Sequence, residues 1–260
     1  MTLRLLTLWP LEPYSETPAN KIRSPVINAS SPGKSDKITA RARIDTIHDL
    51  IRERICLLTY APGSILREAQ LAEEFGCSRT PIREAIKRLE FENLVISKNG
   101  VGTLVTEADF DSLKDVYEMR LKVAELIGTM SPTTCETALV EKLQTIRNRA
   151  DHLHTLENDL EEMARINHEL HYLVSNLIGN SALRHLYNLY YFQTIRVWYQ
   201  LMPHFWSEEV QALKDELDEL INAVKRNDII AVGYTKRNYI ARMINLLQQI
   251  KQPKEVEVAS

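Results

Sequence analysis

The sequence predicts a mainly α protein: an N-terminal winged helix-turn-helix, built of three helices and a β-hairpin wing, followed by an all-α antiparallel helical bundle. Residues 68–105 hold a helix, a sharp turn, a basic helix and a basic-tipped hairpin in that order, and after Glu107 the apolar residues recur at helical spacing without a strand pattern. A chain of 260 residues has room for both cores. The predicted boundaries divide it into residues 1–39, 40–107, 108–250 and 251–260.

Residues 1–39 are rich in Pro, Ser, Asn and Lys and lack a periodic apolar face, which predicts a disordered arm. A basic arm that touches DNA phosphates is the alternative interpretation. The first helix is expected at residues 40–58, with Arg and Asp opposite a single apolar stripe. That stripe consists of Ile44, Ile47, Ile51, Ile55 and Leu58. This helix should complete a three-helix core beneath the helix-turn-helix.

The helix-turn-helix is predicted at residues 68–87. Gly76 is a suitable C-cap for its first helix, and Ser78 is a suitable N-cap for the second, with Pro81 in the first turn. The second helix has two faces: the apolar stripe is Ile82, Ala85, Ile86 and Leu89, and the basic face opposite is Arg79, Arg83 and Lys87. An ordinary helical hairpin with a solvated basic face would show the same spacing. The hairpin that follows favours the winged motif.

The wing is predicted from two short apolar runs, Leu94–Ile96 and Leu104–Val105, on either side of Lys98, Asn99 and Gly100. In this motif class the first turns of the second helix enter the major groove, where the arginine fork suits guanine O6 and N7. Arg79 and Arg83 occupy those turns. Ser78 and Thr80 can donate to a phosphate at the helix N-terminus.

Net charge gives no hint of a DNA-binding role. The chain carries a formal charge of −3, and residues 41–107 hold ten basic and ten acidic side chains, so the inference to DNA depends on where the basic residues lie. The three cysteines are dispersed and form no C-x-x-C pair, which predicts a cytoplasmic protein. No apolar run is long enough to span a membrane, so no membrane contact is expected. The apolar start, LRLLTLWPL, is cut short by Pro10 and Glu12. No phosphate-binding loop, nucleophile elbow or H-E-x-x-H motif supports an enzyme.

Six helices are expected after Glu107, at residues 109–130, 136–153, 157–178, 182–201, 208–225 and 228–250. The fourth is unusually aromatic between Tyr187 and Tyr199 and includes Arg196. Aromatic walls with a few polar groups are typical of small-molecule pockets, although simple core packing would explain the same rings.

Two stretches, APGSILREAQLAEEF and SRTPIREAIKRLE, together with the NG-containing wing, closely resemble the winged-helix domain of the GntR family of bacterial transcription regulators. The remainder is similar to the helical FCD-type ligand domain of the FadR branch. The resemblance, which begins near Arg41, implies DNA contacts at the positions of Ser78, Arg79, Thr80 and Arg83, with Asn99 and Gly100 in the minor groove. The basic Lys87 and Lys98 join this candidate set. Relatives often carry a basic residue or His at the wing tip and some carry an arginine where this chain has Ala69, so contacts there are expected to differ.

Many members of this branch bind a divalent metal through an Asp four residues before a His and two later histidines. Only His171 matches, because Asn167, Leu217 and Tyr239 stand at the other positions, so no metal cofactor of the family type is expected. Instead, a metal-free effector pocket is predicted from Arg120, Asn167, His171, Arg196, Tyr199 and Tyr239. Arg120 could pair with the carboxylate of an organic acid or, alternatively, form a salt bridge within the protein.

The resemblance implies a sequence-specific, metabolite-responsive repressor that binds a palindromic DNA operator as a homodimer. The alternative is a ligand-independent DNA-binding or architectural dimer whose helical domain only dimerises.

Overall fold

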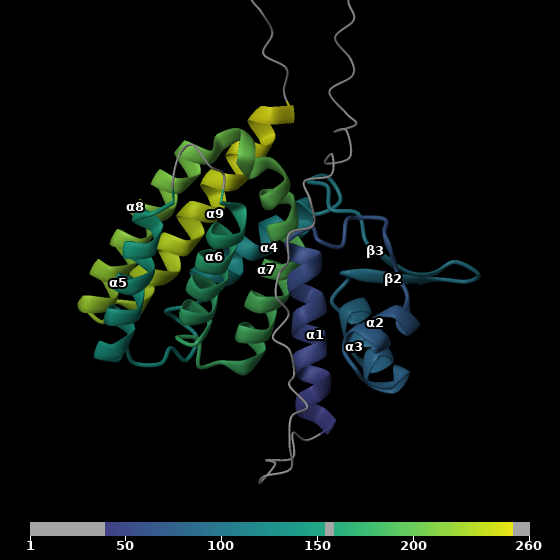
Figure 1. The fold of residues 1–260 in the computed structure, drawn as a ribbon. Helices are drawn as coiled ribbons and strands as arrows, with labels where there is room; N and C mark the ends of the chain where they lie inside the picture. Colours follow the sequence, from purple (N-terminus) through teal and green to yellow (C-terminus); the bar gives the residue numbers. More distant parts are fainter. Residues whose placement is uncertain (1–39, 154–158, 252–260) are drawn as a thin grey trace, which may run out of the picture. The chain divides into compact units, whose positions relative to one another are not determined.

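The computed structural model describes residues 40–153 and 159–251, so the predicted arm at 1–39 and nearly all of the 251–260 tail lie outside the described residues. The first part is a winged helix-turn-helix, as predicted (Figure 1). Its elements are α1 (Ala40–Cys56), β1 (Ile65–Leu66), α2 (Glu68–Glu74), α3 (Arg79–Phe91), β2 (Val95–Lys98) and β3 (Gly102–Val105).

The wing is a three-stranded antiparallel sheet with the order β1-β3-β2. Ile65 pairs with Leu104 and Val95 pairs with Val105. Strand β1 is not predicted from the sequence, because a strand of two residues is too short to show an alternating pattern. Strands β2 and β3 of the hairpin coincide with the two apolar runs from which the wing was predicted.

The core of this part follows the predicted stripes. Ile51 and Ile55 of α1 and Ile82 and Leu89 of α3 are fully buried, and α1 packs directly against α3. Helix α1 ends two residues earlier than predicted, since Leu58 adopts a left-handed φ of 61° that no helix continues.

The second part is a bundle of α-helices, again as predicted. Its elements are α4 (Lys114–Glu125), α5 (Thr137–Asp151), α6 (Leu160–Ser175), α7 (Ser181–Leu201), the 3-10 turn η1 (Met202–Phe205), α8 (Trp206–Lys225) and α9 (Ile229–Lys251). In Figure 1, α7 lies between α6 and α1, and α5 lies beside α8. Within the described residues no helix is both long and apolar enough to span a bilayer.

Helix α4 is shorter than the predicted 109–130. The Ser112 backbone N–H donates to the Asp109 side chain, and the Leu113 N–H donates to the Phe110 carbonyl, so local turns replace the first helical turn. Further turns follow Glu125, where Leu126 donates to the Val123 carbonyl.

Helix α9 lies close to α4 and to the turn that follows α4, because two glycines lie at this contact. A Cβ atom added at Gly128 would lie 2.4 Å from the backbone of Ile230, and one added at Gly233 would lie 2.8 Å from the Ala124 carbonyl oxygen. This approach sets the position of α9 relative to Arg120 on α4.

Helix α7 joins the bundle to the winged helix. The Cys56 thiol donates to the Phe192 carbonyl at 3.7 Å, and the Gln193 amide donates to the Glu92 carbonyl at 2.9 Å. The Arg196 guanidinium donates to the carbonyl and hydroxyl oxygens of Thr106, directly after β3, at 2.9 and 3.0 Å.

A buried histidine lies at the same junction. His48 Nε2 is 2.9 Å from Glu92 Oε1, and His48 Nδ1 is 3.1 Å from Asp49 Oδ1. Burial lowers the pKa of His48, but the hydrogen bonds to the two carboxylates outweigh it and leave that pKa above 6.5. The charged imidazolium therefore stabilises the folded state.

Replacing Gly128 by Ala is expected to lower the free energy of unfolding by roughly 1–3 kcal/mol, because the new methyl group meets backbone atoms that have no side-chain freedom to yield. Urea denaturation measures the loss. The exposed Asn222→Ala on α8 serves as the control and should change stability by less than about 0.5 kcal/mol. Equal stability of Gly128→Ala and wild type would contradict the close α4–α9 contact.

Because the folded-state pKa of His48 is raised, its contribution to stability is complete below a pH of about 6.5 and is lost as the pH rises through the folded-state value. His48→Gln should remove this decline. Denaturation titrations at several pH values between about 6 and 9 measure it. The exposed His185→Gln is the matched control and should retain the wild-type pH profile.

Candidate functional site

The first candidate surface is the exposed face of α3. Ser78, Arg79, Thr80, Arg83 and Lys87 are all exposed, while the opposite face of the helix is buried. Ser78 is the N-cap residue by its extended backbone, but its hydroxyl makes no capping hydrogen bond. The α3 N-terminus therefore presents a hydroxyl and free backbone N–H groups together, an arrangement that suits a phosphate.

Arg83 is held in place by an acidic partner on α2. Its Nε and Nη2 atoms donate to the Glu68 carboxylate at 3.2 and 2.9 Å, and this pairing lowers the pKa of Glu68. Lys87 pairs with Glu84 at 2.9 Å. Both pairs are solvent-exposed, and exposed pairs contribute little stability, so a DNA phosphate or base can replace either carboxylate.

The wing tip is a second exposed basic feature. Lys98, Asn99 and Gly100 are exposed, and the Val101 N–H donates to the Lys98 carbonyl to close the turn. Gly100 has a φ of 76°, which side-chain-bearing residues rarely adopt. The turn thus depends on Gly100 and presents Lys98 and Asn99 to solvent.

The bundle contains a cavity of about 80 Å³ between α4, α6, α7, α8 and α9. Of the six predicted pocket residues, Arg120, Asn167 and Tyr239 line it. The cavity is also lined by four charged residues that were not predicted: Glu209, Glu216, Lys236 and Arg242. They belong to α8 and α9, and no local motif marked them.

These four residues form two ion pairs. Lys236 Nζ lies 2.6 Å from Glu216 Oε1, and Arg242 Nη1 lies 2.6 Å from Glu209 Oε1. Burial raises the pKa of Glu209, although the hydrogen bond from Arg242 opposes that rise.

Arg120 is a buried cation in the same cavity. Its side chain donates to Thr194 Oγ1 at 2.9 Å, and its guanidinium lies 5.3 Å from the centre of the Tyr191 ring. Across the described residues no carboxylate lies within 4 Å of it. An unpaired buried cation favours a bound anion, because transfer of its charge out of water is otherwise poorly compensated.

The other three predicted pocket residues, His171, Arg196 and Tyr199, do not line this cavity. His171 stacks on Tyr187 and Tyr191, with ring centroids 4.6 and 3.7 Å away, and hydrogen-bonds Asn188. Burial holds the pKa of His171 well below 6.5. Arg196 points to Thr106 on the opposite face of α7.

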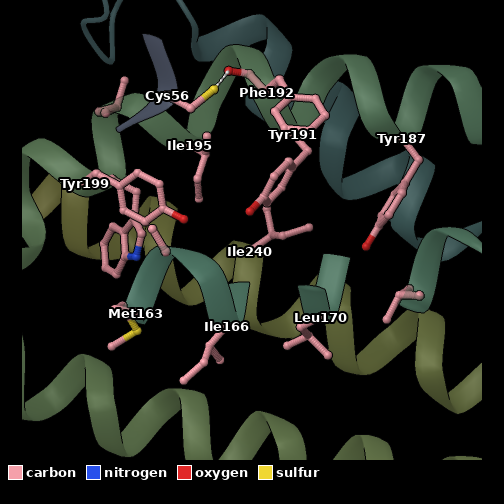
Figure 2. Packing of buried hydrophobic residues seen from close by; sticks show 14 of the residues in the cluster. Cys56, Met163, Ile166, Leu170, Tyr187, Tyr191, Phe192, Ile195, Tyr199 and Ile240 are labelled. Carbon is pink, nitrogen blue, oxygen red and sulfur yellow. Dashed lines mark hydrogen bonds between the residues drawn. The ribbon is translucent and has the colours of Figure 1, made fainter. Parts of the chain in front are cut away.

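Tyr199 is buried in the core next to the cavity rather than in its wall. Figure 2 shows the hydroxyl groups of Tyr191 and Tyr199 turned toward each other, so each phenol is the nearest polar partner of the other. Burial raises the pKa of both phenols, so they are neutral donors. Tyr191 lines the cavity and offers its donor there.

The residues at the family's metal positions do not suit a divalent ion. Asn167 contributes a neutral amide, Tyr239 a protonated phenol and Leu217 a fully buried aliphatic side chain. The described parts of the chain contain no group of three His, Cys, Asp or Glu side chains placed to hold a metal.

Both parts of the chain match known protein families. Residues 43–105 match the model of bacterial regulatory proteins of the gntR family, and residues 115–248 match the FCD domain. The chain is 31% identical over 134 residues to the HTH-type transcriptional regulator YdhC of Bacillus subtilis, covering 50% of this chain and 57% of YdhC. It is 33% identical over 127 residues to the histidine utilization repressor of Klebsiella aerogenes, covering 48% of this chain and 50% of the repressor. These matches span about half the length of the relatives.

Solved structures agree with the fold. McbR/YncC of Escherichia coli has a TM-score of 0.57 at 19% identity, covering 81% of this chain and 99% of McbR. A GntR regulator from Rhodococcus sp. RHA1 has a TM-score of 0.58 at 18% identity, covering 81% of this chain and all of that one. Members of this family are regulators rather than enzymes. The exposed basic helix, the wing and the helical domain are thus those of a DNA-binding transcription regulator, and the chain belongs to the GntR family with an FCD domain at its C-terminal side.

Proposed function

We propose that this regulator is a cytoplasmic, homodimeric repressor that binds a palindromic operator and releases it when an organic acid occupies the bundle cavity. The observation that carries the DNA-binding role is the exposed face of α3, where Ser78, Arg79, Thr80 and Arg83 converge on the helix N-terminus. The family resemblance implies repression rather than activation of transcription, and one relative is named a repressor.

The effector role is supported by the buried Arg120, whose guanidinium has a hydroxyl but no carboxylate partner within the described residues. A ligand carboxylate would supply that partner with two charge-assisted hydrogen bonds. The charged lining of the cavity argues against the alternative of a bundle that only dimerises, whereas the small cavity volume favours that alternative. A thermal-shift screen with organic acids separates them, since only a ligand that binds the folded state raises the melting temperature.

Helix α7 supplies a route from this cavity to the DNA-binding part. Tyr191, Ile195 and Trp198 face the cavity, and the next residues around the helix, Phe192, Gln193 and Arg196, contact the winged helix. Because α7 is one continuous helix, a ligand that displaces its cavity-facing side also displaces the side that contacts the winged helix. Such coupling is allosteric when ligand and operator weaken each other's binding by the same factor.

The dimer is supported by exposed apolar side chains where α4 packs on α9. Leu126, Ile230 and Tyr234 expose 38%, 51% and 51% of their surface. A two-fold dimer would bury such residues and would place two α3 helices on the two halves of a palindrome.

Arg83→Ala is expected to weaken binding to an operator fragment, selected from random DNA, by roughly 1–3 kcal/mol while leaving non-specific binding little changed. Fluorescence anisotropy on operator and scrambled duplexes measures the difference. Arg88→Ala is the matched control, because Arg88 lies on the same helix but pairs with Asp45 of α1. An identical loss on both duplexes would make Arg83 a phosphate contact.

Tyr234→Glu should shift the protein from dimer to monomer in sedimentation experiments, because the new charge would be buried without a partner at the interface. The control Asn222→Glu changes an exposed position on α8 and should remain dimeric. An unchanged dimer for Tyr234→Glu, with native circular dichroism, would place the interface elsewhere.

A further inference from the structure

Two hollow spaces in the bundle share one wall. The inner cavity of about 80 Å³ adjoins an open groove of about 700 Å³ between α8 and α9. Ala212, Tyr239 and Arg242 line both of them. The side chains of Tyr239 and Arg242 therefore lie between the cavity and the groove.

The inner cavity alone is too small for a metabolite. Its volume has room for roughly two or three water molecules at about 30 Å³ each, whereas ligand pockets usually measure about 300–1,000 Å³. An occupied site must therefore extend from the cavity into part of the groove, past Tyr239 and Arg242.

The two ion pairs of the cavity differ in how easily they open. The side chains of Lys236 and Glu216 are 12% and 9% exposed, so that pair is closed within the bundle. Arg242 is 40% exposed while its partner Glu209 is 7% exposed. Arg242 can swing into the groove and regain water, but Glu209 cannot, and it would remain buried without a cation.

The charges of the opened site then specify its ligand. Arg120 requires an anion, and Glu209, once Arg242 has withdrawn, requires a cation. The hydroxyl of Tyr191, a residue only 4% exposed, faces that of Tyr199 and adds a neutral group to the same wall. Farther out, the groove is lined by Glu208, Asp215 and Glu219, whose negative potential disfavours a second carboxylate.

We propose that the effector is a zwitterionic amino carboxylate that enters between α8 and α9, places its carboxylate on Arg120 and its ammonium group on Glu209, and displaces Arg242. This inference rests on the proposed effector site and narrows its ligand class. A monocarboxylate satisfies only Arg120, and a dicarboxylate brings a like charge to Glu209. The ammonium group of the ligand replaces the guanidinium of Arg242 as the partner of Glu209, so this buried carboxylate always has a cationic partner.

The test uses the full chain and a series of straight-chain ω-amino carboxylates from 4-aminobutanoate to 8-aminooctanoate. Each is compared with the monocarboxylate and the dicarboxylate of the same carbon number, by thermal shift and by calorimetry. At least one amino carboxylate should bind about tenfold more tightly than its matched monocarboxylate, which corresponds to one added charge pair. The dicarboxylates should bind most weakly.

Variants of Glu209 and Arg242 test where the ammonium group of the ligand binds. Glu209→Gln should reduce binding of the amino carboxylate to the level of its monocarboxylate, while Arg242→Met should strengthen its advantage by removing the competing cation. Glu141→Gln is the matched control, because this exposed glutamate of α5 lines neither the cavity nor the groove, and it should alter the preference less than about twofold. Circular dichroism and melting curves establish that each variant folds.

The proposal is overturned if a dicarboxylate binds as tightly as its amino counterpart, if Glu209→Gln keeps the preference, or if no amino carboxylate of the series binds. Equal binding of monocarboxylates and amino carboxylates, abolished by Arg120→Gln, would refute the zwitterion and leave the organic-acid effector standing. Operator binding by the ligand-free protein tests the DNA-binding proposal independently of all these results.

Discussion

The two parts of this regulator are held in register by one buried guanidinium. Arg196 is 1% exposed, and its contacts are neutral: the carbonyl and hydroxyl oxygens of Thr106 at the end of the wing. Burial lowers the pKa of Arg196, which measures how unfavourable the site is for a charge. The buried guanidinium depends on these two acceptors. If the end of β3 moved away from α7, Arg196 would remain buried without hydrogen-bond acceptors for its charge.

Other contacts of α7 reinforce this constraint. The Arg52 guanidinium of α1 lies 3.9 Å from the centre of the Phe192 ring, and the amide of Gln193 holds the end of α3 at Glu92. Three elements of the winged helix, namely α1, the end of α3 and the end of β3, therefore meet one short segment of one helix. The same segment turns Tyr191 and Ile195 to the cavity. Since a helix moves as a rigid rod over such a length, the geometry of the cavity and the orientation of α3 are physically linked.

The cavity has charged side chains near the positions where the family resemblance implies metal ligands. With Asn167, Leu217 and Tyr239 at three of the four expected ligand positions, His171 is turned away and stacked between tyrosines. The cations near the cavity are instead side chains: Arg120, Lys236 and Arg242. An arginine binds a carboxylate through two directed hydrogen bonds rather than through coordination, so the recognition that we propose depends on side-chain orientation.

The sequence by itself determined the features that local physics encodes. The two faces of α3, the turn at Gly100 and the apolar stripe of α1 follow from helical periodicity and backbone preference, and the structure reproduces them to within one or two residues. Only the tertiary structure decided which side chains share a space. Arg196 and Tyr191 lie five residues apart on one helix yet face different parts of the molecule, and Glu209 meets Arg242 across 33 positions of sequence. Such long-range meetings depend on how helices cross and rotate against one another, which short-range periodicity does not specify.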